Sequence, residues 1–163
     1  MNPIQVKTRK RLTNWFWFNL YCLNKLPLAF FTGIRIFEFN EKKCVTCVNF
    51  KWLNKNPFRS TYWAVLGIAA ELSTGAYALL ATMGKEENVA VILVSSKAEF
   101  LKKATDVSKF TCEDWQAFNS AVERAIETNE PQSVTSMTVG ENVEGENIAN
   151  FEFTWSFKKR ENT

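Results

Sequence analysis

The chain has 163 residues and a net charge of +3, from 20 lysines and arginines against 17 aspartates and glutamates. It is rich in aromatic residues, with 14 phenylalanines and 6 tryptophans, and this length and composition exclude a disordered chain and predict one domain with a sizeable core. It contains no histidine, which excludes Ser-His-Asp and Cys-His catalysis and histidine-ligated metal sites. Acid–base chemistry would then depend on a carboxylate, Lys, Tyr, Cys or water. No face is obviously basic, so nucleic acid is not an expected partner.

The N-terminal part of the chain divides into a basic stretch and an apolar one. Residues 1–11 are polar and basic, and we expect them to fray. Residues 12–31 are apolar, and their spacing predicts a helix that ends near Pro27. Two neighbouring rows recur at helical spacing: Trp15, Phe18 and Cys22 in one, and Phe16, Leu20 and Leu23 in the other.

Basic residues before an apolar run resemble a signal anchor. Asn and Lys residues interrupt this run, however, and no small-residue cleavage site follows it. We therefore expect a helix that packs on the domain, with a membrane-surface helix as the less favoured alternative. The expected division is a basic, aromatic helical segment at 1–30 and a single domain at 31–163.

A hairpin is predicted next, from two segments rich in β-branched and aromatic residues, 34–40 and 44–52. Cys44 and Cys47 in the second segment match a C-x-x-C pattern, but residues three apart on a strand point to opposite faces and cannot hold one metal ion. Four cysteines and no clear secretion signal favour reduced thiols in a cytoplasmic protein. Neither a metal nor a cofactor is expected.

Residues 60–84 are the most apolar stretch of the chain. Ser60 and Thr61 can cap a helix at its start, and Gly84 can end it. Glu71 is the only charged residue within the stretch. A helix that is apolar on nearly all sides belongs in a core, where a carboxylate is costly unless it is paired or its pKa rises. Glu71 is therefore either an exposed or capping residue of a core helix or a catalytic carboxylate.

The second half of the chain combines four strands with one helix. The strands are predicted at 89–101, 107–112, 132–140 and 148–158, the first of them buried at its start and half-exposed later. Residues 113–130 form an amphipathic helix. Its apolar face comprises Trp115, Phe118, Val122, Ala125 and Ile126. The order of elements predicts an α+β fold in which a six-stranded antiparallel sheet wraps one long helix, with an extra N-terminal helix and a helix before the last two strands.

This arrangement resembles the hot-dog fold. The run from Asn56 to Glu71, NPFRSTYWAVLGIAAE, is similar to the signature of the acyl-CoA thioesterase branch, in which an Asn precedes the helix and an acidic residue lies on its body. The later run at 91–104, VILVSSKAEFLKKA, resembles the strand that follows the helix in that family. The likeness is strongest to an uncharacterised thioesterase-like subgroup and covers roughly residues 30 to 158.

The resemblance implies roles for particular residues. Glu71 would be the base or nucleophile, Asn56 would orient the water or the thioester, and the backbone amide of Trp63 would contribute to an oxyanion hole. The best-studied branch carries His-Gly-Gly where this chain has Tyr62-Trp63-Ala64, so Tyr62 would partly replace the missing donor. The residues expected to contact the substrate are Tyr62, Ser73, Thr74, Arg59 and Lys97, the last two through the phosphates of CoA.

The spacing of these groups predicts an assembly. Glu71 lies eight residues beyond Trp63, which is about 12 Å along a helix at about 1.5 Å per residue, too far to serve one substrate. Two antiparallel helices related by a two-fold axis would bring Glu71 of one chain near the helix N-terminus of the other. The resemblance likewise implies a homodimer, which often pairs again into a tetramer.

Two other functions remain open at this point. The chain could bind an acyl group or an acyl-CoA without cleaving it, which the bulk of Trp63 favours. It could also act at a membrane through its N-terminal aromatic helix.

Overall fold

The computed structural model describes residues 1–160 and has the α+β architecture that the sequence predicts. Its helices are α1 (Pro3–Thr13), α2 (Trp15–Lys25), α3 (Pro27–Thr32), the short 3₁₀ helix η1 (Trp52–Asn54), α4 (Trp63–Thr82) and α5 (Trp115–Thr128). Its strands are β1 (Arg35–Phe39), β2 (Cys44–Val48), β3 (Val89–Phe100), β4 (Ser108–Cys112), β5 (Gln132–Glu141) and β6 (Asn147–Lys159).

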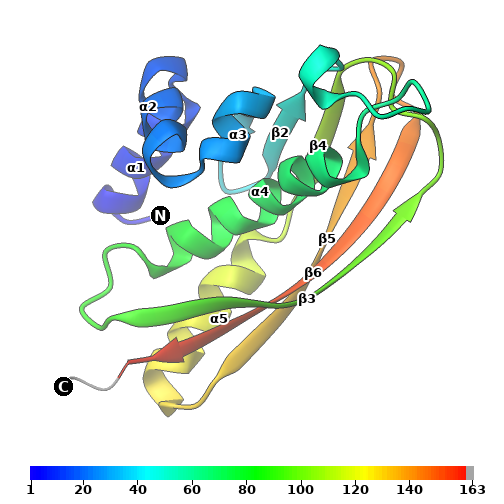
Figure 1. Ribbon diagram of the computed structural model, residues 1–163. Coiled ribbons are helices and arrows are strands. Elements are labelled where there is room, and N and C mark those ends of the chain that lie inside the picture. The colour runs from blue at the N-terminus through cyan, green and yellow to red at the C-terminus, as the bar shows by residue number, and fades with distance from the viewer. Residues whose placement is uncertain (161–163) are drawn as a thin grey trace.

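The six strands form one antiparallel sheet in the order β1-β2-β4-β5-β6-β3. The sheet curls around α4, and α5 packs beside α4 on the same sheet (Figure 1). This is the hot-dog arrangement. It buries a long helix with no polar side, because the sheet and the other helices together cover most of the helix surface.

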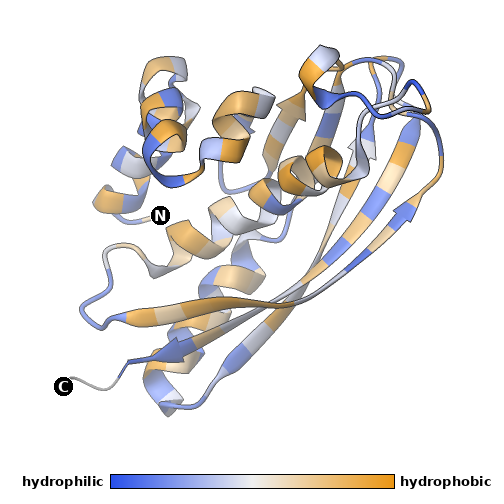
Figure 2. Cartoon of the chain, in the orientation of Figure 1, coloured by the Kyte–Doolittle hydropathy of each residue, from blue (hydrophilic) through white to orange (hydrophobic). Residues whose placement is uncertain are grey.

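Alternation of side chains fixes which face of the sheet meets α4. Burial alternates along both β5 and β6, and in β6 it coincides with an alternation of apolar and polar residues, visible as orange and blue bands in Figure 2. In β6, Phe151, Phe153, Trp155 and Phe157 are buried while the residues between them are half-buried. The two-residue period of a strand therefore directs the aromatic row to the core.

Tyr77 of α4 lies at the centre of this core. Its ring packs against Phe39, Trp115 and Phe118, with centroids 5.3 to 6.1 Å apart. Its hydroxyl donates a 2.7 Å hydrogen bond to the backbone carbonyl of Asn40. The buried hydroxyl thus has the acceptor that it needs in an apolar core.

The prediction that residues 1–11 fray is wrong. They form α1, which Asn2 and Gln5 begin with a capping box. Gln5 is 2% exposed and donates to the carbonyl of Leu80, and Asn2 donates to that of Met83. These polar contacts with the end of α4 hold a helix whose composition alone does not favour order.

The predicted start of the long helix is also corrected. Tyr62 occupies the N-cap position with no side-chain cap, and Ser60 and Thr61 are buried in the preceding loop. The amide of Thr61 donates to the carbonyl of Ala104, which ties that loop to the segment after β3. The backbone amide of Thr61 is thus used in a long-range hydrogen bond, and no side chain caps the helix.

Two strands differ from expectation. Strand β2 ends at Val48, because the chain turns into η1 instead of continuing to residue 52. In β3, Val89 is buried but every residue from 91 to 100 is exposed, so the predicted burial of its first half is wrong. The sequence signals an apolar strand but cannot show that it lies at the edge of the sheet, with only β6 beside it.

The three N-terminal helices share one core with the rest of the chain. Leu12, Phe18, Cys22 and Ala29 are buried and belong to the main apolar cluster. The division into a segment at 1–30 and a domain at 31–163 stays a prediction. Among the described residues, α4 is the one helix long and apolar enough to cross a membrane, and 67% of its most apolar stretch is buried inside the protein.

Candidate functional site

Glu71 is a half-buried residue on the side of α4 that the sheet does not cover. Among the described residues it has no salt bridge and its carboxyl oxygens have no hydrogen-bond partner. Burial raises the pKa of Glu71 from an ordinary 4.5 to about 7. A carboxyl group with this pKa exists in both protonation states near neutral pH and can accept a proton there.

Gly75 makes the space that this carboxyl group occupies. It lies one helical turn after Glu71, and a Cβ atom at this position would come within 2.6 Å of Glu71 Oε1 and 3.3 Å of the Trp155 ring. A glycine in the middle of a helix costs roughly 1 kcal/mol relative to alanine. Gly75 therefore weakens the helix slightly but leaves room for the carboxyl group of Glu71.

Two apolar cavities open onto Glu71. One, of about 170 Å³, lies between α2, α4 and Trp155, and its walls include Phe18, Tyr21 and Leu72. The other, of about 310 Å³, lies beneath the start of α3 and is lined by Leu28, Ile68 and Leu72. Glu71 is thus surrounded by hydrocarbon, which is the cause of its raised pKa.

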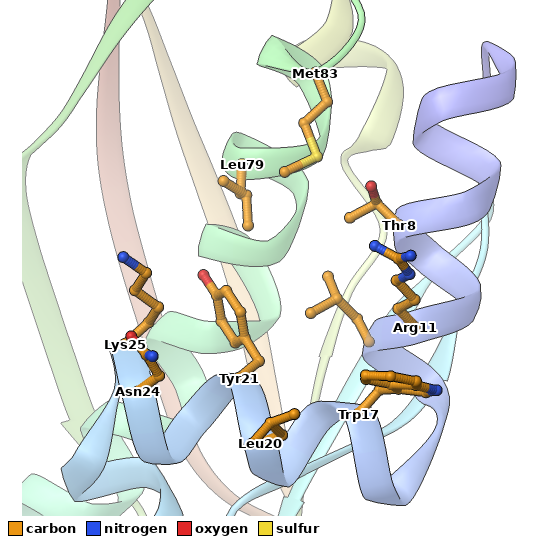
Figure 3. A pocket seen from close by; sticks show the side chains of 10 residues that line it. Thr8, Arg11, Trp17, Leu20, Tyr21, Asn24, Lys25, Leu79 and Met83 are labelled. Atoms are coloured by element: carbon orange, nitrogen blue, oxygen red, sulfur yellow. The ribbon is translucent and has the colours of Figure 1, made fainter.

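A third cavity, of about 390 Å³, continues from the first toward the C-terminal end of α4. Figure 3 shows Tyr21, Leu79 and Met83 on one side of it and Thr8, Arg11 and Trp17 on the other. It shares Leu12, Tyr21 and Leu79 with the cavity at Glu71. The pKa of Tyr21 is raised by burial and, to a smaller extent, by Cys22 and Glu71, which agrees with a position between the two cavities.

Sequence reasoning missed this contribution of the N-terminal helices. Tyr21 and Leu12 lie about fifty residues before Glu71, so no local spacing connects them. The only signal was that the N-terminal helix was expected to pack on the domain, without any indication of where.

The N-terminus of α4 presents free backbone donors. Among the described residues, the amides of Trp63 and Ala64 have no acceptor, whereas those of Tyr62, Val65 and Leu66 are bonded. Unpaired first-turn amides at the positive end of a helix form a favourable site for an anionic oxygen. The Trp63 ring is exposed and lies 5.8 Å from that of Tyr62, so it does not bury the amides.

Asn56 forms its hydrogen bonds within its own loop. Its Oδ1 accepts from the amides of Phe58 and Ser60, and its Nδ2 donates to the Ser60 hydroxyl at 3.1 Å. These bonds shape the turn before α4. Asn56 and Trp63 also line one cavity of about 410 Å³ beneath Phe100 and Lys103. The structure thus brings these two residues together and keeps both apart from Glu71.

Ser73 and Thr74 point into the core. Ser73 Oγ donates to the carbonyl of Ala70 and shares a 2.8 Å hydrogen bond with Thr138 Oγ1, and both Ser73 and Thr74 are fully buried. Thr74 Oγ1 accepts from Trp155 Nε1 at 3.0 Å and donates to the carbonyl of Glu71. Their hydroxyls are engaged on the sheet side of α4, so their predicted contact with substrate has no support in this geometry.

The basic candidates lie on the surface and are separate from one another. Arg59 sits in the turn before α4, with a φ of 61°, and Lys97 lies on the exposed strand β3. Neither makes an ion pair among the described residues, whereas the neighbouring Lys102 pairs with Glu146. No cluster of three or more Cys, Asp or Glu side chains that could hold a metal ion occurs within residues 1–160.

Strand β3 leaves one edge of the sheet unpaired. Val91, Ile92, Leu93 and Val94 on it are between 37% and 64% exposed. A long, exposed, apolar edge strand is a template for pairing with another chain. The partly exposed side of α4, with Ala64, Gly67, Ile68, Glu71 and Gly75, consists mostly of small residues.

Comparison with solved structures supports the fold. A protein of unknown function from Chlorobaculum tepidum matches with a TM-score of 0.78 at 12% identity, covering 96% of this chain and 98% of that one. A probable thioesterase from Pseudomonas aeruginosa matches with a TM-score of 0.73 at 14% identity, over 92% and 99%. A thioesterase from Haemophilus influenzae matches with a TM-score of 0.64 at 16% identity, over 90% and 91%. No family model and no curated protein matches the sequence.

Proposed function

We propose that the chain is a thioester hydrolase that acts on an acyl-CoA, with Glu71 as the base or nucleophile. The observation that carries this proposal is the half-buried, unpaired carboxyl group of Glu71, which faces apolar cavities and has a pKa raised to about 7. Strongly perturbed carboxyl groups in a cavity are typical of catalytic sites. The thioesterases among proteins of similar fold support the choice of reaction.

The acyl chain would occupy the apolar cavities around Glu71. Their walls of Phe18, Leu72 and Leu79 favour a hydrocarbon over a polar group. The thioester carbon would then lie at the carboxyl group, which either activates a water molecule or attacks directly. Arg59 and Lys97 remain candidates for the phosphates of CoA.

The oxyanion would be stabilised by the free amides of Trp63 and Ala64 from a second copy of the chain. These amides lie about 12 Å along the same helix from Glu71, so one protomer cannot present both groups to one carbonyl. The apolar edge of β3 and the small residues on the open side of α4 would form the two-fold interface. Such a dimer would contain two shared sites.

The test measures thiol release from short, medium, long and aromatic acyl-CoAs by the native protein and by Glu71→Gln. Glu86→Gln serves as the control, because Glu86 is an exposed carboxylate in the loop after α4. We expect turnover whose rate rises with pH through about 7, and a loss of roughly 10²–10⁴-fold in the Glu71 variant alone.

Two results would contradict the proposal. Turnover retained in Glu71→Gln would place the chemistry elsewhere. Saturable acyl-CoA binding without turnover on any substrate would instead identify a binding protein, the alternative that the bulk of Trp63 favours.

A further inference from the structure

Helix α2 is apolar on both of its sides. Phe18 and Cys22 face the core and are 3% and 1% exposed. Phe16, Leu20 and Leu23 recur on the opposite side at 60%, 50% and 52% exposure. A helix that covers a soluble domain normally carries polar residues on its outer side. The outer row of α2 therefore needs another explanation than packing within the chain.

Further apolar side chains are exposed on α3 and at the start of α2. Leu28 and Phe31, one turn apart on α3, are 67% and 59% exposed, and Trp15 at the start of α2 is 68% exposed. Figure 1 shows the three N-terminal helices together on one side of α4, with β3 and β6 on the other. We call the exposed apolar residues of α2 and α3 the N-terminal apolar surface; it comprises Trp15, Phe16, Trp17, Leu20, Leu23, Leu28 and Phe31.

The segment that carries this surface is basic. Residues 1–37 carry six basic side chains and no acidic one, while the rest of the chain carries 14 basic against 17 acidic side chains. Lys7, Lys10, Arg11 and Lys25 are exposed, and none of them makes an ion pair among the described residues. Arg11 lies over the Trp17 ring, 6.0 Å from its centre, which links the basic side of α1 to the aromatic helix α2.

We propose that the N-terminal apolar surface docks on an anionic lipid bilayer, with α2 and α3 at the headgroup level. Exposed Trp, Phe and Leu beside Lys and Arg is the composition of helices that lie in a membrane interface. The apolar side chains enter the acyl boundary, and the unpaired cations meet lipid phosphates.

A second copy of the chain is the other occupant to consider, and charge argues against it. A two-fold contact through this surface would bring the same basic segment of both copies together, with no acidic residue in the segment to neutralise it. Interface cores between proteins are also depleted of lysine. An anionic bilayer complements both the apolar and the basic parts. The inference does not depend on the hydrolysis proposed above.

The test is co-sedimentation with vesicles, using the full chain. Deleting residues 1–30 is unsuitable, because it would remove Leu12, Phe18 and Cys22 from the core. We expect binding to vesicles of equal parts phosphatidylcholine and phosphatidylserine, and weak binding to phosphatidylcholine alone. Lys7→Gln combined with Lys10→Gln should weaken binding about thirtyfold, roughly fivefold for each cation removed.

Phe16→Gln combined with Leu23→Gln should abolish co-sedimentation with vesicles of either lipid composition. Trp52→Gln is the matched control, because Trp52 is 78% exposed but lies on η1, outside this surface. For the lysines, Lys55→Gln combined with Lys158→Gln serves the same purpose, since both residues are exposed elsewhere. Neither control should change binding.

Three outcomes would overturn the inference. One is no binding to the anionic vesicles. Another is equal losses in the surface variants and their controls. The third is a change of molar mass in solution, without a change in vesicle binding, when Phe16 and Leu23 are replaced, which would identify a subunit interface.

Discussion

Polar side chains on the two sides of α4 differ in whether they have hydrogen-bond partners. On the side that meets the sheet, Ser73 and Thr74 are fully buried and each has a hydrogen-bond partner on a strand. On the open side, Glu71 is half-buried and its carboxyl oxygens have no partner among the described residues. Buried polar groups that serve only the fold are almost always satisfied. Burial raises the pKa of the Glu71 carboxyl group, which is why we associate this side with chemistry, and changes on the two sides should separate stability from activity.

After the loss of turnover expected for Glu71→Gln, the largest effect is expected at the first turn of α4. Trp63→Pro removes one of the two free amides, yet proline is tolerated at the first helical position, and Tyr62 before it already has extended backbone angles of −63° and 134°. If this amide stabilises the oxyanion, turnover should fall roughly 10²–10³-fold with little loss of stability. Trp63→Ala, which keeps the amide, is the control and should retain most of the activity.

The same variant tests whether the site is shared. In a mixed dimer of Trp63→Pro and Glu71→Gln chains, one of the two sites would contain both an intact amide and an intact carboxyl group. Mixing the two inactive proteins under conditions that exchange subunits should then restore activity. No recovery, with exchange shown by mass measurement, would mean that the two groups do not meet across an interface.

The next effect concerns stability and pH. The native state holds the proton of Glu71 up to a pH of about 7, whereas the unfolded state releases it near 4.5, so native stability falls as pH rises between these values. Above pH 7 the full penalty, about 3 kcal/mol, is present. Glu71→Gln lacks this charge, so denaturant unfolding should find it more stable than the native protein at pH 8 and similar at pH 4. Equal stability at both pH values would show that Glu71 is solvated or paired.

The smallest effect belongs to the sheet side. Ser73→Ala leaves the buried hydroxyl of Thr138 without its partner, which should cost about 1–2 kcal/mol of unfolding free energy. Hydrolysis by the folded variant should be unchanged, because Ser73 points away from the cavities. A loss of activity larger than the loss of folded protein would restore Ser73 as a substrate contact.

The sequence was sufficient for much of the fold because its strongest patterns are local. The alternation in β6 and the apolar run around Glu71 each report burial directly, and their order allows few ways to enclose one helix. Features that depend on long-range contacts could not be predicted from the sequence. Gln5 of α1 is held by the carbonyl of Leu80, and the exposure of β3 depends on its place at the sheet edge. Neither has a signal within a few residues of the chain.

The candidate site was predictable in part for the same reason. Glu71 stands out as one charge in an apolar run, but the hydroxyls of Ser73 and Thr74 look alike in sequence whether they face a substrate or a strand. Ser73 and Thr74 follow Glu71 closely on the helix, but the sequence does not indicate which elements cover each side of that helix. The cavity wall formed by Tyr21 and Leu12 depends on how α1 and α2 dock.

The four cysteines carry a practical consequence. All are free and buried, and burial raises the pKa of the Cys22 and Cys112 thiols to about 11 and that of Cys44 well above its ordinary value. Since the thiolate is the form that reacts, an alkylating reagent will modify them only when the structure opens. Cys22 reports on α2, while Cys44 and Cys112 sit opposite one another on β2 and β4. Alkylation rates followed by mass spectrometry would thus record separately how often the N-terminal helices lift and how often the sheet comes apart, with no label introduced.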